Sequence, residues 1–117
     1  MDLISFTNVS SSFTGFLLNK TYTPFIELPV KRMSFKNNSP TLVVVFTLNT
    51  ENNTSTLTET TAKQLNVFNV SLGSMHVEIA NIRCSADIGS HNIIGMDVLS
   101  HVTCVYNYKQ RTITLHT

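Results

Sequence analysis

At 117 residues the chain has the length of one domain, and a domain of this length can bury roughly two thirds of the surface that its unfolded chain exposes. Charged residues make up only 13% and the formal net charge is +1, so the composition gives no strong field that would attract nucleic acid or a membrane, and neither is expected as a partner. Ser, Thr and Asn supply 40 of the 117 residues, a composition that favours strands and turns over helices.

No run of about 18 apolar residues marks a membrane span, and no basic-then-apolar start marks a signal peptide. We therefore expect one domain over residues 1–117, either intracellular, in the cytoplasm, or cut from a longer protein. Residues 1–24 are expected to form an N-terminal strand or arm. Cys84 and Cys104 both lie in strand-like runs, which favours two buried free thiols over a disulfide.

The N-terminal part of the chain predicts strands that are interrupted by polar breaks. An alternating run at residues 3–7 and an apolar run at residues 13–18 indicate one or two strands. Pro24 and Pro29 then bracket a short apolar segment. Because proline cannot donate to a ladder, we expect an edge strand or an extended arm there.

The next segment, residues 30–35, also predicts a strand, followed by a polar turn. Lys31, Arg32 and Lys36 are interpreted as a solvated strand face and not as a binding patch, because no aromatic residues are interleaved with them. The continuous apolar run at residues 42–46 predicts a strand that is covered on both faces.

A helical pattern follows over residues 56–65, and Thr58 or Thr60 is its expected N-cap. Its buried face is predicted to carry Leu57, Thr61 and Leu65. Period-two alternation and turn residues then predict three further strands, at residues 67–72, 75–79 and 82–88.

Near the C-terminus, Ile93 and Ile94 run directly into Gly95, a pattern typical of a buried strand that is stopped by a backbone bend. A short helical pattern follows. Residues 105–115 then show two alternating strands around a polar turn at residues 108–111.

This C-terminal arrangement resembles the retropepsin-like aspartic proteases, in which an apolar-apolar-Gly strand leads into a short helix and a closing hairpin. A second motif agrees in order and context. The helix ends at Leu65 with the spacing typical of the family, and Asn49-Thr50-Glu51 stands where the family has Asp-Thr-Gly. The resemblance covers roughly residues 25–117 and implies a mostly β fold, a closed barrel like half of pepsin, with one or two short helices.

The catalytic mechanism of the family shows what Asn49 in place of the aspartate would change. Two carboxylates, one from each half of a dimer, share a proton, so that one activates a water and the other donates to the substrate carbonyl. Asn49 can do neither, because its amide does not ionise in the working pH range. Glu51 replaces a glycine on a tight loop and adds a Cβ and a charge. The resemblance thus implies a catalytically inactive domain, which is not an enzyme.

The alternative is an active aspartic endopeptidase. In that case Asn49 is an inactivating mutation, or Glu51 supplies a displaced carboxylate. Glu51 argues against a single silencing mutation. A further difference concerns the flap that covers the substrate in the family: only 27 residues separate Leu65 from Ile93, so we expect a short or absent flap that leaves a substrate open to water.

The resemblance also implies a homodimer, or a module that binds a peptide or protein. In the family, the threonine that Thr50 matches bonds across the two-fold axis, and the terminal strands interleave across the same axis. Two Glu51 carboxylates about 5 Å apart would cost about 3 kcal/mol at an effective dielectric of about 20, and we expect burial of the terminal strands to outweigh this cost. The expected dimer interface comprises Leu3, Ile4, Phe6, Thr50, Glu51, Ile113 and Leu115.

No metal, cofactor or other nucleophile is expected. The four histidines are spread too widely for metal-ligand spacing and are interpreted as surface residues. Cys84 has no histidine beside it in a nucleophile pattern. Ile93, Ile94, Gly95 and Asp97 form the structural motif of the family, and Asp97 is expected to cap the short helix, with no role in catalysis.

Overall fold

The computed structural model describes residues 11–33, 41–65 and 74–117, and these residues are mostly in strands. The described elements follow one another in this order: β1 (Ser12–Leu18), β2 (Thr23–Arg32), β3 (Thr41–Leu48), β4 (Thr56–Leu57), α1 (Glu59–Gln64), β5 (Met75–Ile79), β6 (Ile82–Ile88), β7 (Ile93–Ile94), α2 (Met96–Leu99), β8 (Thr103–Asn107) and β9 (Thr112–His116). This content confirms the predicted mostly β class with two short helices.

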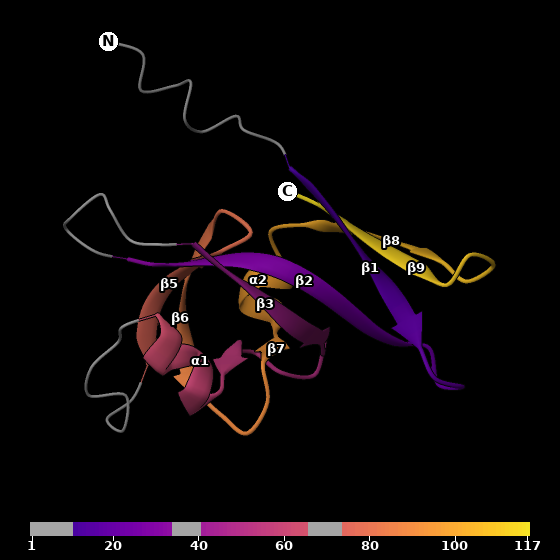
Figure 1. Ribbon diagram of the computed structural model, residues 1–117. Coiled ribbons are helices and arrows are strands. Elements are labelled where there is room, and N and C mark those ends of the chain that lie inside the picture. Colours follow the sequence, from indigo (N-terminus) through magenta and orange to yellow (C-terminus); the bar gives the residue numbers. More distant parts are fainter. Residues whose placement is uncertain (1–10, 34–40, 66–73) are drawn as a thin grey trace, which may run out of the picture.

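Six of the strands form a closed ring. Starting from β2, the neighbours are β3, β7, β4, β6 and β5, and β5 pairs again with β2. Two of these contacts are parallel, β3 with β7 and β4 with β6. Beyond the ring, β2 also pairs with β1, and the sheet continues through β9 to β8. Figure 1 shows α1 at the lower left of the ring, α2 behind β2, and the β1–β9–β8 extension on the right. The closed ring agrees with the predicted barrel.

The inside of the ring is filled by alternate residues of its strands. Because successive side chains of a strand point to opposite faces, one set lies inside and the other outside. β2 contributes Ile26, Leu28 and Val30, which are at most 2% exposed, and β5 contributes Val77 and Ile79, which are fully buried. The alternation predicted for residues 75–79 is therefore confirmed.

The prediction of an edge strand or arm between Pro24 and Pro29 is wrong. β2 lies inside the sheet and pairs with β3 from Phe25 to Lys31. On its other edge it pairs first with β1, up to Phe25, and then with β5, from Val30 onward. Pro29 lies directly before this change of neighbour, a place where a missing N–H is tolerated.

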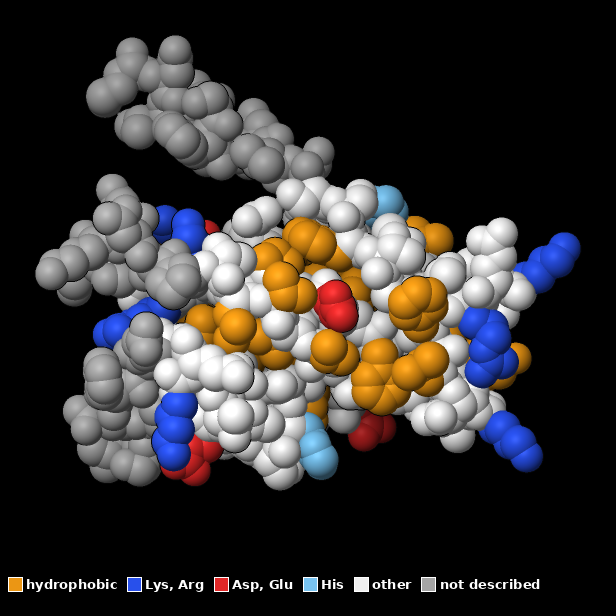
Figure 2. Space-filling model, viewed as in Figure 1, with side chains coloured by type: hydrophobic (Ala, Val, Ile, Leu, Met, Phe, Trp, Pro, Cys, Tyr) orange, Lys and Arg blue, Asp and Glu red, His pale blue; other side chains and the backbone are white. Residues whose placement is uncertain are grey.

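β3 is covered on one face only, so the prediction of two covered faces is also wrong. Val44 and Phe46 point into the core, whereas Val43 is 62% exposed and Val45 is 53% exposed. Glu27 of β2 lies opposite Val45 on the same outer face. Figure 2 shows hydrophobic side chains gathered on this face around an acidic one. No layer of the described chain packs over this side of the sheet.

The helix α1 begins later than predicted, at Glu59, because Leu57 belongs to β4. Thr58 is its N-cap, as expected, and its hydroxyl accepts a hydrogen bond from the Thr61 N–H at 3.2 Å. The predicted buried face is confirmed, since Leu57, Thr61 and Leu65 are all buried.

Of the remaining predictions, some are confirmed and others concern residues that the structure does not describe. The strands predicted at 13–18 and 82–88 and the C-terminal hairpin are present. The predicted strands at 3–7 and 67–72 lie outside the described residues. Cys84 and Cys104 are free thiols, as expected, although both are half-buried. None of the described helices is long and apolar enough to cross a membrane.

Candidate functional site

The loop at Asn49-Thr50-Glu51 follows β3 directly and is held by backbone hydrogen bonds. The Asn49 N–H donates to the Ile94 carbonyl at 2.9 Å, and the Asn52 N–H donates to the Asn49 carbonyl at 3.3 Å. The half-buried Asn49 side chain closes a turn, because its Oδ1 accepts from the Glu51 N–H at 2.9 Å. Thr50 and Glu51 are exposed. The side chain at the position of the expected aspartate is thus a neutral amide engaged in a local turn.

Behind this loop a partly buried hydrogen-bond network joins the start of α2 to the chain before β4. Ser55 is fully buried, and its Oγ–H donates to Asp97 Oδ1 at 2.6 Å. The Ser55 N–H lies 3.0 Å from both oxygens of the same carboxylate. The Ser55 Oγ also accepts from the Gly95 N–H at 2.9 Å. Every polar group of this cluster therefore has a partner, and the network fixes α2 against the loop.

Gly95 makes the close approach between α2 and the loop possible. A Cβ at this position would lie 2.7 Å from the Asn52 carbonyl oxygen and 2.9 Å from the carbonyl carbon and oxygen of Thr54. Its φ is −102°, which other residues adopt freely, so glycine is required here by space and not by backbone conformation. The Met96 N–H donates to the same Asn52 carbonyl at 2.7 Å.

Asp97 does not occupy the N-cap position of α2, so its predicted capping role is wrong. Gly95 is the N-cap of α2 and provides no side-chain hydrogen bond. Asp97 lies in the first turn, and its Oδ1 accepts from the Val98 N–H at 2.9 Å as well as from Ser55. The placement of its charge near the helix start is confirmed, and the carboxylate is occupied by structural hydrogen bonds.

The residues expected at the dimer interface are undescribed, buried or exposed in the structure. Leu3, Ile4 and Phe6 lie outside the described residues. Ile113 and Leu115 are fully buried within one chain, because β9 lies between β1 and β8. Within this chain they are core residues, and their expected place at a dimer interface stays a prediction. Thr50 and Glu51 remain exposed, so for them the interface stays a prediction.

The remaining histidines and thiols, which could in principle bind a metal or act in catalysis, either lie apart from one another or are held in an unreactive form. His76 and His116 each lie within hydrogen-bonding distance of a serine hydroxyl, and no described group of three His, Cys, Asp or Glu could hold a metal. Burial, and to a lesser extent the charge of Asp97, raises the pKa of the Cys84 thiol to about 12. Burial also raises the pKa of Cys104. Both thiols are therefore held in their unreactive, protonated form.

Ser55 is the residue of this region that the sequence did not single out. It lies in a run of Asn, Thr and Ser, in a chain where 40 of 117 residues are of these three types. The only signal was its place, six residues after Asn49 and directly before the apolar strand and helix. To identify Ser55 from the sequence, one would have had to assume in advance that its hydroxyl bonds to Asp97.

No family model matches the sequence, and no curated protein is similar enough to count as a relative. Among solved structures, the crystal structure of a retropepsin-like aspartic protease from Rickettsia conorii resembles this chain with a TM-score of 0.60. The sequence identity is 15%, and the similarity covers 92% of this chain and 91% of that one. At this identity the likeness concerns the fold, and the chain has a retropepsin-like fold.

Proposed function

We propose that the chain is a catalytically inactive retropepsin-like domain that works as a homodimerisation and protein-binding module. The observation that carries this proposal is Asn49. It stands directly after β3, where the chemistry of an aspartic protease requires a carboxylate, and its amide oxygen is bonded to the Glu51 N–H. An amide in this position cannot take a proton from water or share one with a partner.

Neither of the nearby carboxylates is a convincing substitute. Glu51 is exposed two residues further along the loop, away from the place that Asn49 occupies. Asp97 accepts hydrogen bonds from Ser55 and Val98, so its oxygens are directed into the protein. A general base needs a free oxygen within reach of the water that it activates. These contacts favour the inactive domain over an endopeptidase with a displaced carboxylate.

The activity test compares the wild-type chain with Asn49→Asp and Asn49→Ala. Each is incubated with an unfolded protein substrate at acidic and neutral pH, with and without a pepstatin-type transition-state mimic. We expect no inhibitor-sensitive cleavage by any of them, because Asn49→Asp restores the carboxylate but leaves Glu51 in place. Cleavage by the wild type would contradict the inactive assignment. Cleavage by Asn49→Asp alone would show that the loop still supports catalysis.

The dimerisation half of the proposal rests on β8. It is the last strand of the described sheet, pairs only with β9 there, and presents its other edge to solvent. Its neighbouring residues Val105 and Tyr106, which alternate between the two faces, are 48% and 40% exposed. An apolar strand with a free edge is a template for pairing with another chain. Antiparallel pairing of β8 with the β8 of a second copy would give a self-complementary interface.

A single charge on this edge tests the dimer. Val105→Lys is expected to shift the chain toward monomer in sedimentation at micromolar concentration, because a charged side chain on an edge strand opposes pairing. Val43→Lys is the matched control, since Val43 is similarly exposed but lies on the outer face of β3. A wild-type chain that is monomeric at these concentrations, or a dimer that Val105→Lys leaves intact, would contradict this interface. Deletion of β9 is unsuitable, because Ile113 and Leu115 belong to the core.

A further inference from the structure

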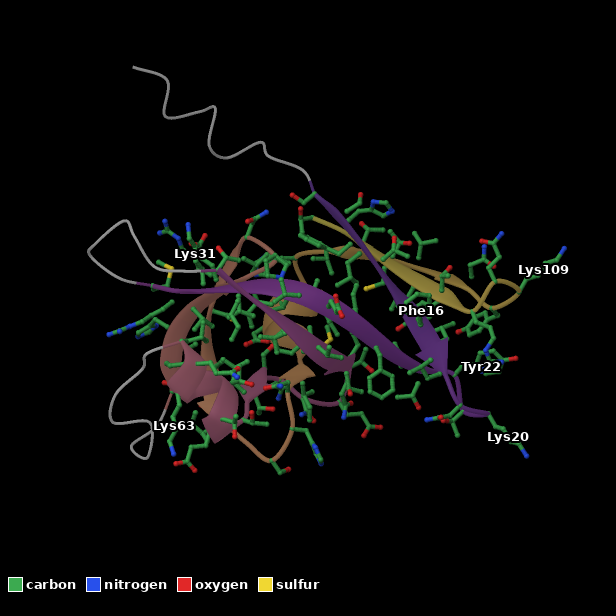
Figure 3. The ribbon with its side chains drawn as sticks, in the orientation of Figure 1. Phe16, Lys20, Tyr22, Lys31, Lys63 and Lys109 are labelled. Carbon is green, nitrogen blue, oxygen red and sulfur yellow. The ribbon has the colours of Figure 1, made fainter. Side chains whose placement is uncertain are left out.

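Two turns distant in sequence meet at one end of the molecule and bring three tyrosines together. The turns join β1 to β2 and β8 to β9, and they lie side by side because β1 pairs with β9. The Tyr22 and Tyr108 rings have centroids 5.5 Å apart in an edge-to-face contact, and the Tyr106 and Tyr108 rings stack at 5.9 Å. Figure 3 labels Tyr22 between Lys20 and Lys109 at this end. We call this the tyrosine surface, formed by Lys20, Tyr22, Tyr106, Tyr108, Lys109 and Arg111.

Arg111 is held in a defined position on this surface. Its guanidinium carbon lies 4.5 Å from the centre of the Tyr22 ring, and its Nη2 donates to the Asn19 carbonyl at 2.6 Å. Its backbone carbonyl accepts from the Leu17 N–H, which ties the turn to β1. A guanidinium fixed in this way loses little side-chain entropy when it binds an anion, and its remaining N–H groups can hold a carboxylate.

The tyrosine surface carries positive charge that the neighbouring strands do not neutralise. Neither residues 11–26 nor residues 98–117 contain any Asp or Glu, whereas they contain Lys20, Lys109 and Arg111. Within the described residues neither lysine forms an ion pair, and the salt bridge present there joins Lys63 to Glu59 in α1. The net charge of +1 for the whole chain thus conceals a local concentration of three cations.

Exposed aromatic and apolar side chains accompany these charges. Tyr108 is 60% exposed and the other two tyrosines about 40%, while Phe16 and Leu18 of the adjoining β1 are 62% and 45% exposed. Figure 2 shows hydrophobic side chains reaching the end of the molecule where basic ones project. Tyrosine and arginine are the residues that most often dominate protein interfaces, and their clustering here is typical of a binding surface.

We propose that the tyrosine surface binds an acidic polypeptide segment. Carboxylates of the segment pair with Arg111 and the two lysines, and its apolar side chains pack on the exposed tyrosine rings. This inference deepens the binding half of the proposed function, on which it rests, by naming the chemistry of the partner. It does not depend on the dimer.

Two features favour a polypeptide over other anionic partners. Single-stranded nucleic acid stacks its bases on open aromatic faces, whereas here Arg111 covers a face of Tyr22 and two rings stack on each other. A membrane-inserting end carries apolar residues at its tips, whereas these two tips consist of Asn19-Lys20-Thr21 and Lys109-Gln110. The rings lie behind polar tips, where a chain that runs across the surface can reach them.

The test measures fluorescence anisotropy of a labelled peptide of alternating Glu and Leu residues, with an analogue carrying Gln in place of Glu. We expect the Glu peptide to bind at least tenfold more tightly, and the double variant Lys20→Glu/Lys109→Glu to weaken its binding at least tenfold. The matched control is Lys31→Glu/Lys63→Glu, which changes the net charge equally at the opposite end (Figure 3). We expect it to weaken binding less than twofold.

Further arms separate this site from general attraction between charges. Arg111→Lys keeps the charge but loses the planar fork, so a severalfold loss of affinity is expected. An unchanged affinity, or equal losses in the two double variants, would overturn the site. So would absence of saturable binding to the Glu peptide, or tighter binding to an oligothymidine strand or to phosphatidylserine vesicles. Sedimentation of the wild type and of each variant beside its titration shows whether peptide binding fails while the dimer persists, so that failure of this site is distinct from failure of the dimer.

Discussion

The loop at Asn49 to Glu51 and the network around Ser55 are neighbours in the fold, yet they differ in almost every physical respect. The loop exposes Thr50 and Glu51, and its Asn49 amide forms a single side-chain hydrogen bond. The network has a buried centre at Ser55 and Gly95, is fully paired and is tightly packed around Gly95. The contrast teaches that the packing beneath a loop and the chemical groups that the loop presents depend on different residues and can vary independently.

Among changes in the loop and the network, the largest effect is expected for Gly95→Ala. The added methyl group would meet backbone atoms of Asn52 and Thr54 at 2.7 to 2.9 Å, and backbone cannot move aside as a side chain can. We expect a loss of about 3 kcal/mol or more in the free energy of unfolding, measured with urea. Gly89→Ala is the control, because the atoms nearest to its methyl belong to the Thr56 side chain, at 3.0 to 3.3 Å, and the change should cost about 1 kcal/mol. Equal losses would remove the special status of the network.

Ser55→Ala should have the next largest effect. It removes the donor to Asp97 and leaves the buried Gly95 N–H without an acceptor, so we expect a loss of about 2 to 3 kcal/mol. Ser85→Ala provides the comparison, because the Ser85 hydroxyl meets His76 in an exposed contact and should contribute less than about 0.5 kcal/mol. A small effect of Ser55→Ala would mean that water replaces the hydroxyl in the network.

The charge of the network can be measured through Cys84. Burial is the main cause of its raised pKa, and the negative charge of Asp97 is the second. Asp97→Asn removes the second cause and lowers the thiol pKa, so alkylation of Cys84 at alkaline pH should become severalfold faster. Cys104, for which burial alone raises the pKa, should change little.

Loosened packing could also speed the alkylation of Cys84, and Ser55→Ala controls for it. That variant weakens the network but keeps the Asp97 charge, so its Cys84 rate should stay close to that of the wild type. If both variants accelerated the reaction equally, the effect would come from opening of the structure and not from the carboxylate.

The smallest effect is expected in the loop itself. Asn49→Ala removes one hydrogen bond in an exposed turn and should reduce the free energy of unfolding by about 0.5 kcal/mol. Thermal unfolding measured beside Ser55→Ala would show the contrast directly. A loss at Asn49 as large as that at Ser55 would mean that the loop is itself a structural element, and the comparison between the two regions would fail.

Much of the fold could be predicted because strand alternation survives in the sequence. The patterns at residues 75–79 and 82–88 and the C-terminal hairpin gave strands that the structure confirms. The apolar run at residues 42–46 correctly predicted a strand but not which of its faces is buried. Val43 and Val45 are apolar although exposed, so both faces of the strand have apolar residues and the sequence does not show which face is uncovered. The prolines led to the wrong prediction of an edge strand. The sheet accommodates Pro29 because β2 changes its neighbour from β1 to β5 there, and this pairing between distant segments cannot be inferred from the local sequence.

The candidate site was predictable only in part for a similar reason. The positions of Asn49 and Gly95 followed from local motifs, because each stands at the end of an apolar strand. The Ser55–Asp97 contact joins residues 42 positions apart and has no local signature. The burial of Ile113 and Leu115 likewise depends on β9 being flanked by two strands of its own chain, which the alternation of β9 alone cannot reveal.

The pairing of β1 with β9 has a consequence for how the chain is made. Ser12 lies opposite His116, so the first described strand waits for a partner 104 residues further along. At a synthesis rate of about 5 to 20 residues per second, roughly 5 to 20 s pass between the emergence of the two strands from the ribosome. Throughout that interval the edge of β1 that will meet β9 is unpaired beside the exposed Phe16 and Leu18. Until β9 arrives, this unpaired edge can pair with other chains, so a chaperone that shields it would raise the yield of folded protein.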